Sequence, residues 1–153
     1  MKINVKVLVF SILAVYLIAF VGSLFTSPAT GSQWYLDNKP AITPPNYVFP
    51  IVWNILFLLI ALSLYFAWMK AKRKQKGELV IVFGINLMLN ALWTFLFFTL
   101  KRPSWAFAEL IALEFTIVAM IIVTRRIDKK SAWLLVPYLV WVGFAGVLNL
   151  LWI

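Results

Sequence analysis

Five segments of the chain are each long and apolar enough to cross a lipid bilayer. An α-helix rises about 1.5 Å per residue and the hydrocarbon core is about 30 Å thick, so a span needs about 20 mostly apolar residues. Backbone amides inside lipid need internal hydrogen-bond partners, so we expect each segment to be a helix. The sequence therefore predicts an all-α membrane protein, a single domain over residues 1–153 that forms a bundle of five transmembrane helices. The predicted spans are Val5–Phe25, Tyr47–Met69, Leu79–Leu100, Pro103–Thr124 and Ser131–Ile153.

The composition agrees with lipid as the solvent and excludes several kinds of chemistry. Hydrophobic residues make up 64% of the chain and charged residues 12%, and a soluble chain of this size cannot bury so much apolar surface. Because the chain has no cysteine and no histidine, we expect no disulfide, no thiolate catalysis and no metal site. The net charge of +9 comes from short basic runs between apolar segments, so we expect contact with the lipid bilayer and no nucleic-acid partner.

The same basic runs predict how the helices are oriented. With five crossings, the N-terminus, the second loop and the fourth loop share one side, which holds eleven Lys and Arg against three on the other. The positive-inside rule then places the N-terminus in the cytoplasm and the C-terminus outside. The eleven are Lys2, Lys6, Lys70, Lys72, Arg73, Lys74, Lys76, Arg125, Arg126, Lys129 and Lys130, and the three are Lys39, Lys101 and Arg102.

The first span has a second interpretation as a signal peptide. Lys2 and Lys6 precede its apolar run, and a basic start before an apolar core is typical of signal peptides. The run continues to Phe25, which is longer than the usual signal-peptide core of about 7–15 residues. We therefore expect this segment to be retained as a helix.

The first loop, residues 26–46, is the one long connection between the predicted spans. Long loops in compact domains are usually functional or disordered. Pro40, Pro44 and Pro45 stiffen it, and Trp34 and Tyr35 are suited to an anchor at the membrane interface. We expect this loop to act as a lid over the bundle, and the alternative is a passive tether at the interface.

Unusual side chains gather in the half of the bilayer beneath this loop. Polar groups in lipid are costly, so their shared depth predicts a pocket formed by the second to fifth spans under the lid. The alternative is that the asparagines only join helices by hydrogen bonds and the tryptophans only fill space between them. Counting 1.5 Å per residue from the helix ends, the residues in this half are Asn54, Asn90, Asn149, Glu109, Trp53 and Trp93, with Trp141 near the middle of its span.

Two further residues inside the spans, Glu114 and Pro137, are unusual for a membrane helix. Glu114 lies deeper than Glu109, so it is either protonated or paired. No intramembrane Lys, Arg or His is available to partner it, which argues against a proton relay and leaves its role open. Pro137 lacks a backbone N–H and is expected to kink the fifth span just below Trp141.

The order of motifs along the chain resembles the TspO/MBR family. This family comprises the bacterial tryptophan-rich sensory proteins and the mitochondrial translocator protein, or peripheral benzodiazepine receptor. The resemblance covers about residue 33 to the end of the chain. It rests on the run W-Y-L-D-N-K-P at residues 34–40, the run T-P-P at residues 43–45, and Trp53, Asn90, Trp93, Phe97, Phe98, Trp105, Ala106, Glu109, Ala132, Leu134, Leu135, Pro137, Tyr138, Trp141, Phe144, Ala145, Leu148, Asn149 and Trp152.

The resemblance implies a five-helix membrane protein that forms a homodimer and binds porphyrins, such as protoporphyrin IX or haem, or other flat hydrophobic small molecules. It implies no obligatory cofactor. Mitochondrial members also bind cholesterol through a tyrosine followed by a basic residue near the end of the fifth helix, and this chain lacks that motif. The ligand-binding residues that the resemblance implies are Trp34, Tyr35, Trp53, Asn90, Trp93, Trp141, Ala145 and Leu148.

Three functional hypotheses follow. The first is a sensor, carrier or scavenger of tetrapyrroles. The second is an enzyme, because some relatives degrade protoporphyrin IX in light and oxygen, which implies catalytic roles for Trp53 and Trp141. The third is a regulatory membrane subunit whose pocket holds only lipid. The charge distribution and the lack of a mitochondrial-type extension favour the inner (plasma) membrane of a bacterium.

Overall fold

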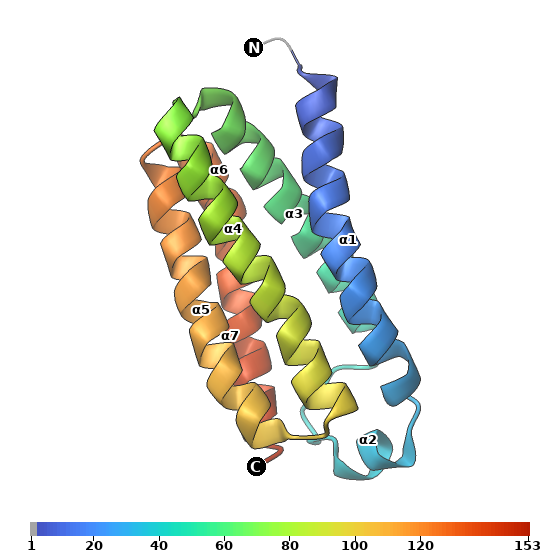
Figure 1. Ribbon diagram of the computed structural model, residues 1–153. Coiled ribbons are helices and arrows are strands. Elements are labelled where there is room, and N and C mark those ends of the chain that lie inside the picture. Colours follow the sequence, from blue (N-terminus) through green and yellow to red (C-terminus); the bar gives the residue numbers. More distant parts are fainter. Residues whose placement is uncertain (1–2) are drawn as a thin grey trace.

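The predicted bundle of five membrane-length helices is confirmed for residues 3–153, the part of the chain that the structure describes. The computed structural model places them side by side along one axis (Figure 1). Lys2, counted above among the basic residues, lies outside the described residues. The spans are α1 (Val5–Ala29), α3 (Val48–Lys70), α4 (Arg73–Thr94) with its π-helical extension η1 (Phe95–Thr99), α5 (Pro103–Arg125), and the pair α6 (Lys129–Leu134) and α7 (Val136–Leu150).

Helix ends follow local chemistry that the sequence carries. Asn4 caps α1, because its side chain accepts a hydrogen bond from the Val7 amide. Pro103 lies in the first turn of α5 as expected, where its missing N–H costs no helical hydrogen bond. The first helix continues past its predicted end at Phe25 to Ala29, since Pro28 lies in the last turn and removes only one backbone donor.

The fifth span is interrupted, as Pro137 predicts. Leu135 is both the C-cap of α6 and the N-cap of α7. Pro137 falls in the first turn of α7. Proline is tolerated there because backbone N–H groups of the first turn have no acceptor within the helix, so its missing N–H costs no hydrogen bond. The Leu139 amide then donates to the Leu135 carbonyl at 3.1 Å, which restarts the helical pattern.

The long first loop contains a short helix that was not predicted, α2 (Gln33–Asn38). Ser32 caps it by accepting a hydrogen bond from the Tyr35 amide at 3.3 Å. In Figure 1, α2 lies at the end of the bundle where the chain also ends, away from the N-terminus. The loop is therefore ordered structure over one end of the bundle.

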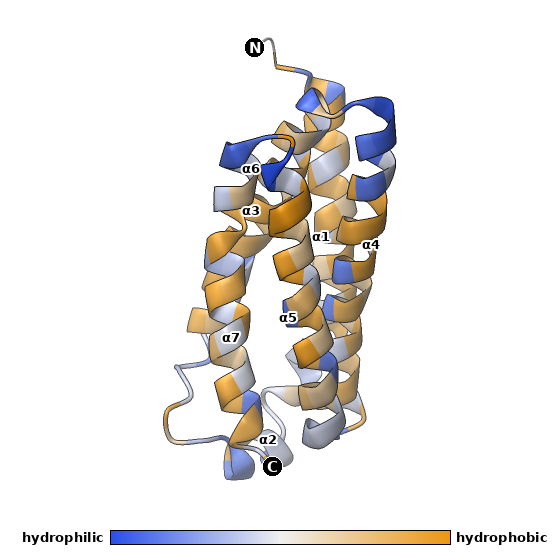
Figure 2. Cartoon of the chain, turned by 90° about the vertical axis from the view of Figure 1, so that its left-hand side faces the viewer, coloured by the Kyte–Doolittle hydropathy of each residue, from blue (hydrophilic) through white to orange (hydrophobic). Residues whose placement is uncertain are grey.

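The outside of the bundle is apolar and its two ends are polar. Phe10, Phe115 and Val140 are among the many large apolar residues with most of their surface exposed, and lipid is the solvent that such a surface requires. Figure 2 shows hydrophilic residues gathered at the end that carries the N-terminus, the start of α4 and the α5–α6 turn. We call this the basic end, because the runs around Lys72–Lys76 and Arg125–Lys130 lie there.

Candidate ligand-binding site

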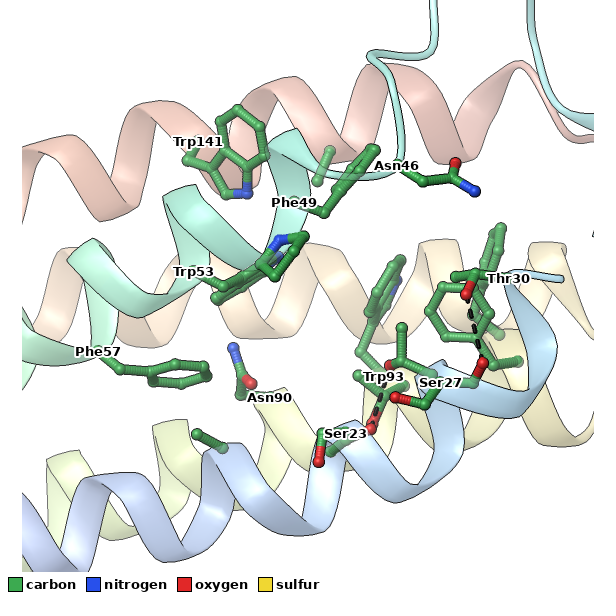
Figure 3. Close-up of a pocket in the computed structure, with 18 of the residues that line it drawn as sticks. Ser23, Ser27, Thr30, Asn46, Phe49, Trp53, Phe57, Asn90, Trp93 and Trp141 are labelled. Atoms are coloured by element: carbon green, nitrogen blue, oxygen red, sulfur yellow. Dashed lines mark hydrogen bonds between the residues drawn. The ribbon is translucent and has the colours of Figure 1, made fainter.

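A cavity of about 510 Å³ lies at the opposite end of the bundle, beneath the first loop. It is lined by the second half of α1, the first half of α3, the end of α4 with η1, and α7. Tyr35 of α2, with Thr43 and Asn46 of the loop, lines it on the loop side. In Figure 3 the labelled side chains from α1, α3, α4 and α7 surround one common space. Its volume falls in the range of about 300–1,000 Å³ that is typical of small-molecule sites.

All but one of the predicted ligand-binding residues line this cavity. The exception is Trp34, which packs against Phe97 and Trp152 and is not part of the cavity wall. Whether any of them binds a ligand stays a prediction, but the structure does bring them together from four helices. The residues on the wall are Tyr35, Trp53, Asn90, Trp93, Trp141, Ala145 and Leu148.

A chain of hydrogen bonds joins the cavity wall to the middle of the bundle. Asn90 Nδ2 donates to the Tyr138 hydroxyl at 3.1 Å, and that hydroxyl donates to Asn86 Oδ1 at 3.2 Å. Asn86 Nδ2 then donates to Thr116 Oγ1 at 2.9 Å. Asn86 and Asn90 therefore do link helices, because this chain of hydrogen bonds connects α4, α7 and α5. It also holds the Asn90 side chain in place at the cavity wall.

A second polar link fixes Trp93. Its indole Nε1 donates to Asn149 Oδ1 at 3.0 Å, and Asn149 Nδ2 donates to the Pro103 carbonyl at 2.9 Å. Both Trp93 and Asn149 lie on the cavity wall. Asn54 differs from the other asparagines, because it donates to the Pro50 carbonyl of its own helix. The polar residues of the outer half thus serve both packing and the cavity surface.

Two hydrogen-bond donors on the cavity wall have no protein partner. Neither Trp141 Nε1 nor Thr43 Oγ1 makes a hydrogen bond to any of residues 3–153, although both atoms are shielded from solvent. An unpaired buried donor costs about 1–3 kcal/mol unless something satisfies it. Because neither atom reaches the cavity surface, the two residues present other atoms to the cavity.

Helix α1 supplies cavity residues that were not predicted. The sequence predicted a pocket formed by the second to fifth spans only. Ser23, Ser27 and Thr30 recur at helical spacing and line the cavity with Thr26. Each of Ser23, Thr26 and Thr30 also donates to a carbonyl three or four residues earlier, so none is costly in lipid. The signal available in the sequence was this run of hydroxyl residues near the end of an otherwise apolar span.

The loop is held over the cavity by aromatic packing on η1. Trp34 and Tyr35 lie against Trp152 with ring centroids 4.8 and 5.6 Å apart, and Tyr35 also contacts Phe98 at 6.1 Å. The π-helical turn of η1 leaves Phe97 and Phe98 both buried in this cluster. Burial raises the pKa of the Tyr35 phenol above its ordinary value, so the group stays neutral. The Lys101 ammonium lies 5.6 Å from the Trp34 ring centre, which adds a cation–π contact.

The prediction that the fourth span helps to form the pocket is wrong, because no residue of α5 lines the cavity and its two acidic residues, Glu109 and Glu114, lie apart from the wall. Neither oxygen of Glu109, nor Oε2 of Glu114, has a hydrogen-bond partner among residues 3–153. Gly143 of α7 faces Glu114, and a Cβ there would lie 3.4 Å from its Oε1. We have no physical account of why an acid stands at position 114.

Comparison with known proteins agrees with this architecture. The TspO/MBR family model matches residues 11–152. The tryptophan-rich protein TspO of Archaeoglobus fulgidus is 40% identical over 147 residues, which cover 95% of this chain and 94% of that protein. The translocator protein of Bos taurus is 31% identical over 134 residues, which cover 85% of this chain and 78% of that protein. On this evidence, and with its five membrane-length helices, the chain belongs to the TspO/MBR family.

Proposed function

We propose that this protein binds a tetrapyrrole such as protoporphyrin IX or haem in the cavity beneath the first loop, as a sensor, carrier or scavenger. The observation that carries the proposal is the aromatic lining of a cavity of about 510 Å³. Phe49, Trp53, Phe57, Trp93 and Trp141 offer ring faces and edges from three helices. Such surfaces suit a flat hydrophobic ligand because they give a large contact area with little loss of side-chain entropy.

The polar groups of the cavity fit a ligand that also carries acceptors. Ser27 near the end of α1, together with Asn46, offers hydrogen-bond donors on the loop side (Figure 3). A tetrapyrrole with its ring among the aromatic residues and its propionates toward the loop satisfies both parts of the wall.

Titration of the detergent-purified protein with protoporphyrin IX in the dark tests this proposal. We expect saturable quenching of tryptophan fluorescence, because Trp53, Trp93 and Trp141 lie on the cavity wall. Ala145→Phe adds a ring to a cavity residue and should abolish saturation. Ala112→Phe makes the same change on the exposed surface of α5 and should leave saturation intact. The proposal would be rejected if quenching never saturates, or if Ala145→Phe and Ala112→Phe give the same quenching curve.

Light-dependent breakdown of the bound porphyrin is a second candidate, favoured by Trp53 and Trp141 lying on the same cavity wall. Light and dioxygen would be its co-reactants. After saturation in the dark, illumination in air should then yield a new absorbing product. Trp53→Phe and Trp141→Phe should each slow its formation, whereas Trp105→Phe, an exposed position, should not. Unchanged spectra under light would leave binding as the function.

We also infer the setting in which the protein works. The basic end of the bundle is expected to face the cytoplasm of a bacterial inner (plasma) membrane, so that the cavity lies toward the outer face. The homodimer that the resemblance implies remains a prediction. Its test is the mass of the detergent-solubilised protein, measured by light scattering with the detergent contribution subtracted.

A further inference from the structure

A groove of about 310 Å³ lies at the basic end of the bundle, at the far end of the molecule from the cavity. It is formed by the last turns of α5, by α6 and by the first residue of α7. Along each helix its residues are three or four apart, so they share one face. Figure 2 is turned toward this side and shows the hydrophilic α5–α6 turn above an apolar band. The groove is lined by Ile121, Arg125, Lys129, Ala132, Trp133 and Val136.

Two cations at the rim of this groove have no partner in the described part of the chain, residues 3–153. Arg125 and Lys129 are both exposed, and the one salt bridge among residues 3–153 joins two other residues, Lys70 and Asp128. The carboxylate nearest in sequence cannot compete for them. Asp128 Oδ1 accepts from Lys70 at 2.7 Å, and Oδ2 accepts from the Ser131 amide and hydroxyl. Both rim cations are therefore available to an anion from outside the chain.

Below the cations the groove becomes apolar in the direction of the membrane. Ala132 is buried, and Ile121 and Val136 are half-buried. Trp133 is 73% exposed, a position suited to the headgroup level of a bilayer, where indole rings are enriched. One helical turn deeper, Val118 of α5 and Val140 of α7 continue the same faces and are exposed. A molecule that fits this site has an anionic head and a long apolar tail.

We propose that this groove binds an anionic phospholipid of the surrounding membrane, with its phosphate between Arg125 and Lys129. One acyl chain lies along Ile121 and Val136, and the Trp133 ring covers the glycerol region. A free anion would meet the cations but leave the apolar part uncovered. A phosphatidylcholine would bring its own cation toward Arg125 and Lys129, so it binds less well. Basic grooves between helices at the cytoplasmic side are suited to such headgroups.

Lipid retention measured by native mass spectrometry tests this site. The delipidated protein is offered equal amounts of phosphatidylglycerol and phosphatidylcholine in detergent. We expect the unmodified chain to retain phosphatidylglycerol selectively. The double variant Arg125→Gln, Lys129→Gln should retain it about thirty-fold less, the effect of losing two basic residues at the headgroup. Arg125→Lys with Lys129→Arg should restore retention, which shows that charge at these positions decides it.

The turn itself provides a matched control. Arg126 and Lys130 are exposed on the same turn but do not line the groove. Arg126→Gln with Lys130→Gln removes the same charge and should leave selective retention intact. If both double variants lost selective retention equally, general surface charge would explain the effect and the proposal would be overturned. Displacement of the lipid by millimolar glycerol phosphate would also overturn it, because it would assign the groove to a soluble anion.

Discussion

Tyr138 links the cavity wall to the interior of the bundle. Its side chain is fully buried between helices, and its hydroxyl both accepts from Asn90 and donates to Asn86. Its ring also meets the edge of Trp53, with centroids 6.2 Å apart. A single residue of α7 thus fixes the position of two cavity residues, one by a hydrogen bond and one by aromatic contact.

Tyr138→Phe should destabilise the protein by about 1–3 kcal/mol, because it keeps the ring and leaves Asn90 and Asn86 each short of a buried partner. Hydrogen bonds between membrane helices contribute about 0.6 kcal/mol each on average, so the loss of two places the effect at the low end of this range. Equilibrium unfolding in mixed micelles measures the difference. Tyr47→Phe, at a mostly exposed hydroxyl, is the control and should change nothing. Equal stability of the two variants would contradict a role for the network.

At the scale of elements, α3 and α6 are joined at the basic end by two polar contacts. Ser63 Oγ donates to the Ser131 carbonyl at 2.8 Å, and Lys70 pairs with Asp128, the N-cap of α6. Burial by itself raises the pKa of the Asp128 carboxyl. The hydrogen bonds from Lys70 and Ser131, with the Lys70 charge, outweigh burial and hold the pKa below its ordinary value of 3.8.

This lowered pKa predicts how stability depends on pH. A carboxyl whose pKa is lower in the folded state contributes stability above its unfolded pKa, and the contribution is lost as pH falls through the folded value. Asp128→Asn should therefore lower the melting temperature in detergent at pH 7, and the gap to the unmodified protein should narrow below a pH of about 4. Asp37→Asn, at an exposed loop carboxylate, is the control. A gap that stays constant with pH would contradict the ion pair with Lys70 as the source of the loss.

The spans could be predicted from the sequence because length and hydropathy decide them, and Pro137 also marked the interruption of the fifth span. The short elements could not. Helix α2 depends on a six-residue segment between prolines, and its position depends on Trp34 and Tyr35 meeting Trp152, which lies more than a hundred residues away in the sequence. The π-helical turn of η1 likewise depends on Phe97 and Phe98 packing in that cluster, a tertiary effect that no local propensity records.

For the molecule as a whole, depth along a helix was predictable and direction around it was not. Lipid-facing and buried sides of these helices are both apolar, so periodicity does not tell which side faces the interior. The depth of Trp53, Asn90 and Trp93 correctly located the cavity level, and the family resemblance selected which residues line it. Neither the depth of polar residues nor the resemblance identified helix α1. Its hydroxyl residues carry little energetic cost in lipid, and the resemblance begins after this helix.

The charge asymmetry between the two ends predicts the orientation of the protein in the membrane. If the basic end faces the cytoplasm, a cysteine in place of Lys39, in the exposed first loop, should react with a membrane-impermeant maleimide in intact cells. A cysteine in place of Lys74, exposed at the start of α4, should react only after the membrane is permeabilised. The unmodified chain has no cysteine and supplies the background. Each substitution removes one positive charge, so the bias toward the basic end persists in both. The reverse labelling pattern would show that the protein has the opposite orientation, with the cavity toward the cytoplasm. Labelling of both positions in intact cells would mean that the chain inserts in two orientations.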